Sequence, residues 1–224
     1  EYGGLWTWVS EIAASRMRAD APESAHALGG RMDGNLARNE FQAPYQPASR
    51  AGVASTMVPR ALEGATREAL GRVVKRYGDL DQMIATEFGY SKEELGEVLS
   101  VEQIDALGLY VHADDRGRGM LIADQAGVGK GRTQAAIARR EVLRDKKVIY
   151  LTEKAMNFSD VYRDLAHTRS TDLVKPLVLN DGANIIDETT GEVILKGANA
   201  ESMKALIASG RWPEDANLMM GSYS

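Results

Sequence analysis

The sequence predicts an α/β fold in which a parallel β-sheet carries helices on both faces and is preceded by a mostly helical N-terminal extension. From about residue 120 onward, short apolar runs alternate with helical segments. This order is typical of a parallel sheet, because each crossover between parallel strands needs a connecting helix. Before residue 100 the apolar residues follow a helical period without such strands. With 44% hydrophobic residues among 224, the chain can fill a core of this size.

The part before the sheet divides into two segments. Residues 1–58 are rich in Gly, Pro and polar residues, and we interpret them as an extended, wrapping segment with one short amphipathic stretch over residues 5–17. Residues 59–98 form the helical extension, with helices expected over 59–77, 80–88 and 91–99. Ser91 and Glu94 have the spacing of a capping box, which satisfies backbone amides at a helix start.

Residues 99–224 are the predicted α/β part. Its first element is a helix that opens near residue 100. After it, strands are expected over residues 120–123, 147–152, 177–179 and 217–221, with a small additional strand over 191–196. Helices are expected over 130–144, 159–167 and 200–209.

Composition excludes several classes of function. The chain has no cysteine, which removes disulfides, thiolate metal sites and cysteine nucleophiles. Its three histidines show no metal-ligand spacing. No apolar run is long enough to span a bilayer, and no signal peptide is visible, so we expect a soluble, intracellular protein without a membrane partner. The first residue is Glu1 and the last residues resemble an interrupted strand, so we expect a piece of a longer polypeptide.

A phosphate-binding loop is predicted between the expected strand at 120–123 and the helix at 130–144. Two spaced glycines can turn successive amides toward phosphate oxygens, the helix start adds a positive dipole, and Lys130 can reach the outer phosphates and act in catalysis. The alternative is a glycine-rich turn whose lysine only faces water. We expect the loop to bind the phosphates of ATP through Asp124, Gln125, Ala126, Gly127, Val128, Gly129, Lys130, Gly131 and Arg132.

This loop departs from the usual motif at both ends. The usual pattern begins with Gly and ends in Gly-Lys-Ser/Thr, whereas this chain has Asp124 and Gly131 at those positions. Gly131 removes the hydroxyl that normally binds Mg²⁺. Thr133, two positions further on, is our candidate substitute for that metal contact.

An adenine-reading residue is predicted upstream. Gln103 lies 27 positions before Lys130 and close to a helix start. A glutamine amide there can form paired hydrogen bonds with adenine. Ser100 and Gln103 also have the spacing of a capping box, which would explain the glutamine without any ligand.

Polar residues end the expected strand at 147–152. Thr152 and Lys154 are our candidates for contacts with nucleic-acid phosphates, because ligands of parallel sheets bind beyond the carboxyl ends of the strands. The alternative is an ordinary strand end followed by a helix capped by Ser159.

The order of these motifs resembles the strawberry notch family, which includes DarB-like antirestriction helicases of phages and plasmids. The resemblance covers residues 41–224 and rests on four segments, which are residues 45–60, 99–103, 124–132 and 151–164. The Lys-Gly-Arg ending of the loop is common in that family. The final Gly-Ser-Tyr-Ser is similar to the family's Thr-Tyr-Ser strand end, with Gly221 departing from it.

The resemblance implies a superfamily 2 ATPase with two RecA-like lobes, of which residues 99–224 are part of the first. Such an ATPase would use ATP and Mg²⁺ to move on or remodel duplex DNA, with the other lobes in the same polypeptide and a methyltransferase or another module linked to it. These residues contain no Walker B segment and no second lobe, so we expect little hydrolysis from this stretch alone. A nucleotide-binding scaffold without hydrolysis is the alternative. A P-loop kinase is a third hypothesis, which the position of Gln103 disfavours.

Overall fold

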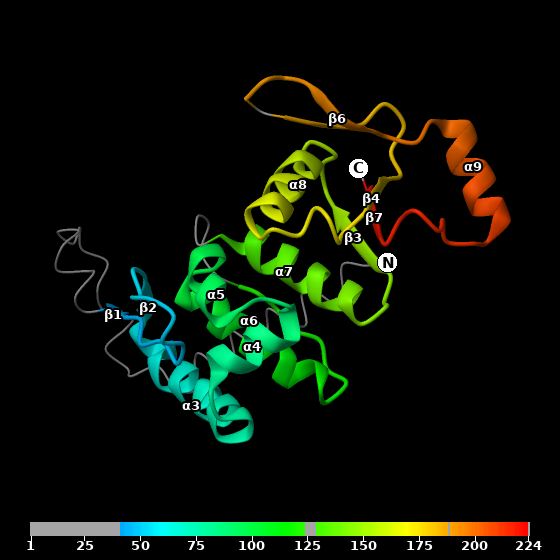
Figure 1. The fold of residues 1–224 in the computed structure, drawn as a ribbon. Coiled ribbons are helices and arrows are strands. Elements are labelled where there is room, and N and C mark those ends of the chain that lie inside the picture. The colour runs from blue at the N-terminus through cyan, green and yellow to red at the C-terminus, as the bar shows by residue number, and fades with distance from the viewer. Residues whose placement is uncertain (1–40, 124–128, 188, 224) are drawn as a thin grey trace, which may run out of the picture. The chain divides into compact units, whose positions relative to one another are not determined.

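The computed structural model describes residues 41–123, 129–187 and 189–223. The chain divides into residues 1–41 and residues 42–224, and every helix and strand below belongs to the second unit. Figure 1 shows the fold, with most of its elements labelled. The helix expected over residues 5–17 lies outside the described residues.

Four helices form the extension and the start of the α/β part, and they confirm the predicted helices. They are α3 (Arg60–Tyr77), α4 (Leu80–Phe88), α5 (Lys92–Val98) and α6 (Val101–Asp114). Asp79, Ser91 and Ser100 cap the starts of α4, α5 and α6 through their side chains. Their apolar faces meet in one core, which includes Ile84, Phe88, Leu95, Ile104 and Leu107 at 0% exposure.

A two-stranded sheet precedes these helices and was not predicted. It pairs β1 (Gln42–Pro44) with β2 (Met57–Pro59) in antiparallel register. The loop between the strands is held by buried Asp105 of α6, which accepts hydrogen bonds from Tyr45 Oη, Ala48 N and Ser49 N at 2.8–2.9 Å. Burial raises the pKa of Asp105, and these donors oppose that rise.

A parallel three-stranded sheet confirms the predicted α/β class. Its order is β3 (Val148–Thr152), β7 (Leu218–Ser222) and β4 (Pro176–Val178). Leu218 and Met220 of the central strand are 1% and 0% exposed. They pair in register with Val148 and Tyr150 of β3, so these four side chains share one face of the sheet.

Helices α7 (Lys130–Leu143) and α8 (Asn157–His167) supply the apolar residues that cover this face. Ala135 and Val142 of α7 and Phe158 and Leu165 of α8 join Met220 in the second core. On the opposite face, Ile149 and Leu151 of β3 are 64% and 66% exposed among the described residues.

The strand predicted over residues 120–123 is not formed, and that expectation is wrong. Leu121 is 69% exposed, and the described strands pair with one another and not with these residues. A strand needs a neighbour for its backbone N–H and C=O groups. The apolar run indicated a buried strand, but apolar composition alone cannot supply a pairing partner.

The segment between β4 and β7 contains a hairpin and a helix. The predicted strand at 191–196 is β6 (Val193–Lys196), which pairs with β5 (Asn184–Ile186) in antiparallel register. Asp187 Oδ1 accepts hydrogen bonds from two backbone amides in the turn between them. The predicted helix at 200–209 is α9 (Ala200–Ser209), capped by Asn199.

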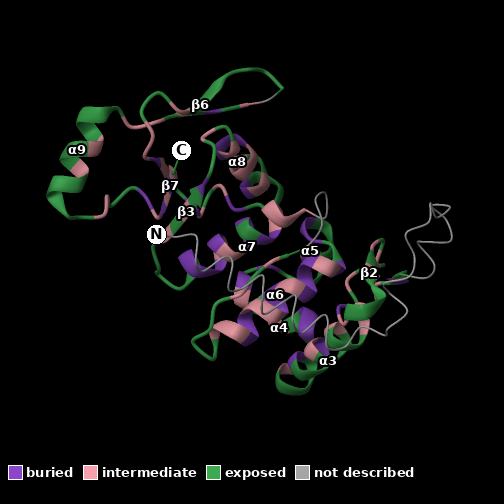
Figure 2. Ribbon diagram, turned by 180° about the vertical axis from the view of Figure 1, so that it is seen from behind, coloured by how far each residue is buried: buried purple, intermediate pink, exposed green. Residues whose placement is uncertain are grey.

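Helix α7 belongs to both cores and so connects the helical extension with the sheet. Ala136 packs in the core of α3–α6, whereas Ala135 and Val142 pack in the core of the sheet. Figure 2 shows buried residues on α4, α6 and α7. The position of α7 is therefore determined by packing on two sides.

A buried arginine also fixes α7. Arg140 is 1% exposed and donates hydrogen bonds to Glu87, Asp114 and Glu141 at 2.6–2.9 Å. Burial opposes its charge, but these carboxylates together raise the pKa of Arg140 above its usual range. The network joins α4, α6 and α7.

Within the described ranges, no helix is long and apolar enough to cross a membrane.

Candidate functional site

The predicted phosphate-binding loop ends at the first turn of α7. The N-cap residue is Gly129, with φ 79° and ψ 38°, which has no side chain to cap the helix. Glycine adopts this left-handed conformation without the steric cost that a Cβ atom would impose. The first turn contains no acidic residue. Its backbone amides and the helix dipole therefore favour an anion at this end.

Gln103 lies against this glycine. Its Nε2 donates a 3.1 Å hydrogen bond to the Gly129 carbonyl, and its Oε1 accepts one from Ser100 N at 3.0 Å. A Cβ atom at residue 129 would overlap Nε2. The capping box that we weighed as an alternative is formed. The same side chain also contacts the loop, so the cap does not account for all of its hydrogen bonds.

Gly131 faces the carboxylate of Asp164 on α8. A Cβ atom at residue 131 would overlap Asp164 Oδ2 and lie 3.0 Å from its Cγ. Burial raises the pKa of Asp164, and the charges of Arg163, His167 and Arg132 oppose this rise. Sequence reasoning did not identify Asp164. The available signal was Gly131 itself, because a missing side chain at a motif position leaves space for another group.

Arg132 and His167 meet beside this pair. Arg132 Nη2 lies 3.4 Å from His167 Nδ1, and the same ring nitrogen lies 3.9 Å from Asp164 Oδ1. His167 occupies the last turn of α8. Lys130, Gly131 and Arg132 are all half-buried. The first turn of α7 is therefore positively charged, with one carboxylate next to it.

Of the other predicted site residues, five lie outside the described part of the chain and three lie within it. Asp124, Gln125, Ala126, Gly127 and Val128 lie outside the described residues. Thr133, our predicted metal contact, is 2% exposed on α7. Its role stays a prediction.

Thr152 and Lys154 lie at the carboxyl end of β3. Thr152 is buried, and its Oγ1 accepts a 2.8 Å hydrogen bond from Asn157 Nδ2, whereas Lys154 is exposed. The helix cap at Ser159, which belonged to the alternative interpretation, is not formed. Helix α8 starts two residues earlier, and Ser159 Oγ instead accepts a hydrogen bond from Ile186 N. The nucleic-acid contacts remain a prediction.

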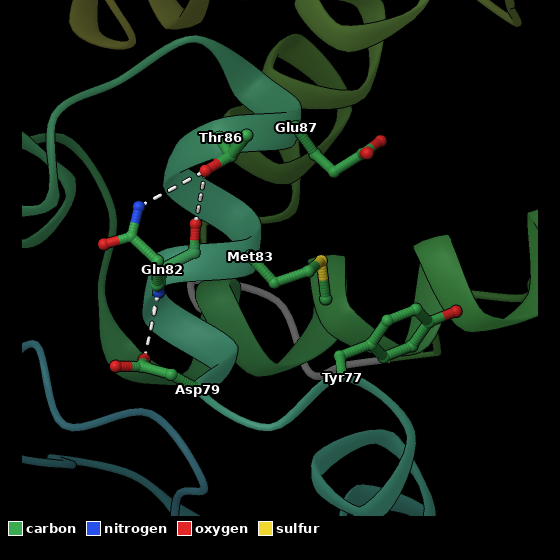
Figure 3. Close-up of a pocket in the computed structure, with 6 residues that line it drawn as sticks. All are labelled: Tyr77, Asp79, Gln82, Met83, Thr86 and Glu87. Carbon is green, nitrogen blue, oxygen red and sulfur yellow. Dashed lines mark hydrogen bonds between the residues drawn. The ribbon is translucent and has the colours of Figure 1, made fainter.

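An open hollow of about 260 Å³ lies elsewhere, on the helical extension (Figure 3). Met83 and Glu87 project from α4 toward the side where Tyr77 lies. None of the lining residues is a predicted site residue, and we assign no function to this hollow. They are Tyr77, Asp79, Gln82, Met83, Thr86 and Glu87.

A family model described as P-loop containing NTP hydrolase pore-1 matches residues 72–197, which is more than half of the chain. The chain belongs to this family. The matched region contains Gln103, the first turn of α7, Thr152 and Asp164. No curated protein and no solved structure matches the chain significantly. Membership of a P-loop NTP hydrolase family indicates nucleotide binding, usually with a divalent metal ion, and nucleotide hydrolysis as the general activity.

The residues at the start of α7 fit a nucleotide phosphate. Gly129 has the backbone conformation that a phosphate loop needs, this N-cap residue has no side chain to cap the helix amides, and Lys130 is the first residue of the helix. Neither Gly129 nor Gly131 has a side chain between these amides and a ligand. The predicted P-loop therefore ends on the first turn of α7, where Gly129 contacts Gln103 of α6 and Gly131 faces Asp164 of α8.

Proposed function

We propose that this chain is the ATP-binding lobe of a superfamily 2 helicase or translocase, which in the intact polypeptide couples ATP hydrolysis to movement on duplex DNA. The observation that carries the proposal is the contact between Gln103 and Gly129, at 3.1 Å. A glutamine upstream of a P-loop is expected near adenine in this superfamily. The contact places Gln103 beside the loop, and paired hydrogen bonds between its amide and adenine are part of the proposal.

Each residue at the start of α7 would have its own role in binding the nucleotide. The amides of the first turn of α7 and the Lys130 ammonium would hold the β- and γ-phosphates. Arg132, beside them, is a further phosphate contact. Bound Mg²⁺ would neutralise charge that develops on the phosphates during transfer. The two cores that hold α7 would keep these groups in place, since phosphoryl transfer depends mainly on positioning and electrostatics.

The carboxyl edge of the sheet is the proposed DNA path. The strands β3, β4 and β7 are parallel, so their carboxyl ends lie at the same edge. Polar residues gather there, including Thr152 and Lys154, and Asn180 exchanges two hydrogen bonds with Ser222 at 2.7 and 2.9 Å. Hydroxyl, amide and lysine groups are the usual donors to backbone phosphates.

The resemblance to the strawberry notch family supports duplex DNA as the partner. Within that family, the DarB-like relatives suggest a role in phage or plasmid antirestriction or defence, with a methyltransferase or another module linked in the same polypeptide. The scaffold hypothesis differs from this proposal in one respect, which is that nucleotide would bind without being hydrolysed.

The test is ATP turnover by the intact polypeptide with and without duplex DNA. We expect turnover to rise with DNA and to fall by at least about a hundredfold in Lys130→Ala, because that lysine acts on the transferred phosphoryl group. Lys75→Ala is a matched control, since Lys75 is exposed on α3. ATP binding without turnover would support the scaffold, and turnover indifferent to DNA would argue against the motor.

A further inference from the structure

Gly131 and Asp164 occupy positions that are complementary in space. In the common P-loop motif the residue after the lysine is Ser or Thr, and its hydroxyl binds Mg²⁺. Here that residue is Gly131, and the first side-chain atom it could carry would overlap Asp164 Oδ2. A carboxylate oxygen from α8 therefore lies where a side chain at residue 131 would begin. The two groups exclude each other.

We propose that the Asp164 carboxylate supplies the protein oxygen ligand for Mg²⁺ that a serine or threonine hydroxyl supplies in the common motif. The proposal rests on nucleotide binding at this P-loop. Carboxylate oxygen is a preferred protein ligand of Mg²⁺, which typically takes one or two carboxylates together with phosphate oxygens and water. One carboxylate beside the loop is therefore sufficient.

The surroundings hold Asp164 in place. It follows Arg163 and precedes Leu165, which is 0% exposed in the core of the sheet. The Asp164 side chain is itself 15% exposed. A carboxylate that is partly shielded from water gains more from a metal ion than an exposed one, because the ion replaces lost solvation. This is consistent with the raised pKa that burial gives Asp164.

Removal of the Asp164 charge should have opposite effects on ATP affinity with and without a metal ion. Without a cation, the carboxylate repels the phosphates, so its removal should strengthen binding of free ATP. With Mg²⁺ between them, the carboxylate attracts the complex, so its removal should weaken binding of Mg-ATP. A residue that only supported the fold would change both affinities in the same direction.

The experiment is equilibrium binding of ATP to the full chain in excess Mg²⁺ and in EDTA. For Asp164→Ala we expect Mg-ATP affinity to fall by roughly 10- to 100-fold, as for loss of a charged contact, and metal-free affinity to stay equal or rise. Asp164→Asn keeps the shape and should behave similarly. The control Lys75→Ala, at an exposed position on α3, should keep the dependence on Mg²⁺.

A second substitution tests the exclusion directly. In Asp164→Ala, the vacated space can hold a hydroxyl, so adding Gly131→Ser should restore part of the Mg²⁺ dependence. Gly131→Ser alone should weaken Mg-ATP binding, because serine and Asp164 overlap. The deciding quantity is the ratio of the affinity in excess Mg²⁺ to the affinity in EDTA. If this ratio is the same in wild type and in Asp164→Ala, the inference is overturned, while nucleotide binding at the P-loop still stands. No ATP binding by wild type in either condition would overturn the proposed function as well.

Discussion

Replacement of Gly129 by alanine tests the loop geometry most specifically. Gly129 has φ 79°, and a Cβ atom there would overlap Gln103 Nε2. A left-handed conformation costs a non-glycine residue about 1–2 kcal/mol. If Gln103 withdraws, its hydrogen bond to the Gly129 carbonyl is lost, at about 1 kcal/mol. We expect Gly129→Ala to lower the free energy of unfolding by about 2–3 kcal/mol.

The assay is urea unfolding followed by far-ultraviolet circular dichroism, run as a double-mutant cycle with Gln103→Ala. Without the glutamine only the backbone cost remains, so the two substitutions should couple by about 1 kcal/mol. Gly64→Ala is the control. Gly64 lies in α3 with open space around it, and alanine there should stabilise the helix by about 0.5–1 kcal/mol. Equal costs of Gly129→Ala in both backgrounds would refute the contact, and no cost in either would refute the loop conformation.

The other predictions concern the sheet and the charge network. Met220→Ala should cost about 2–5 kcal/mol in unfolding free energy, whereas Leu151→Ala on the exposed face should cost less than about 0.5 kcal/mol; equal values would contradict the assignment of the two faces. Hydrogen bonds from Arg140 and Arg144 lower the pKa of Asp114, so its contribution to stability is present above the unfolded pKa near 4 and is lost as pH falls through the lower folded value. Asp114→Asn should therefore lower the free energy of unfolding at pH 7, as measured by urea unfolding midpoints. It should also make that free energy fall less steeply between about pH 5 and pH 2. An unchanged pH dependence in this range would contradict the role of the network.

Helical segments were the most predictable part of the chain, because their signals are local. Apolar spacing predicted α3, and the Ser91 and Ser100 capping boxes marked the starts of α5 and α6, as found. The helix at 200–209 was also correct at both ends. Such caps and periods involve residues within one or two turns, so distant parts of the chain do not alter them.

Pairing between strands was less predictable, because it depends on partners far apart in sequence. The run at 120–123 has strand composition but no neighbour among the described strands. Conversely, β5 is only three residues long and was missed, although Asp187 and Gly191 mark the turn that follows it. The strands β1 and β2 were missed, because most of their residues lie in the segment interpreted as extended and wrapping.

In the candidate site, too, local features were predictable from the sequence and contacts between distant residues were not. The loop and Gln103 were predicted from local patterns, and the structure adds a hydrogen bond between Gln103 and Gly129. Asp164 could not be predicted, because the relation between Gly131 and α8 exists only after α7 and α8 have packed together. A departure from a motif therefore indicated where to look, and only the fold identified which residue lies there.

Equilibrium binding of ATP to this chain and to Lys130→Ala tests the central claim most directly, which is that the start of α7 binds nucleotide phosphates. The account predicts saturable binding that weakens by about 10- to 100-fold in Lys130→Ala and is unchanged in Lys75→Ala. Equal affinity of wild type and Lys130→Ala would contradict it.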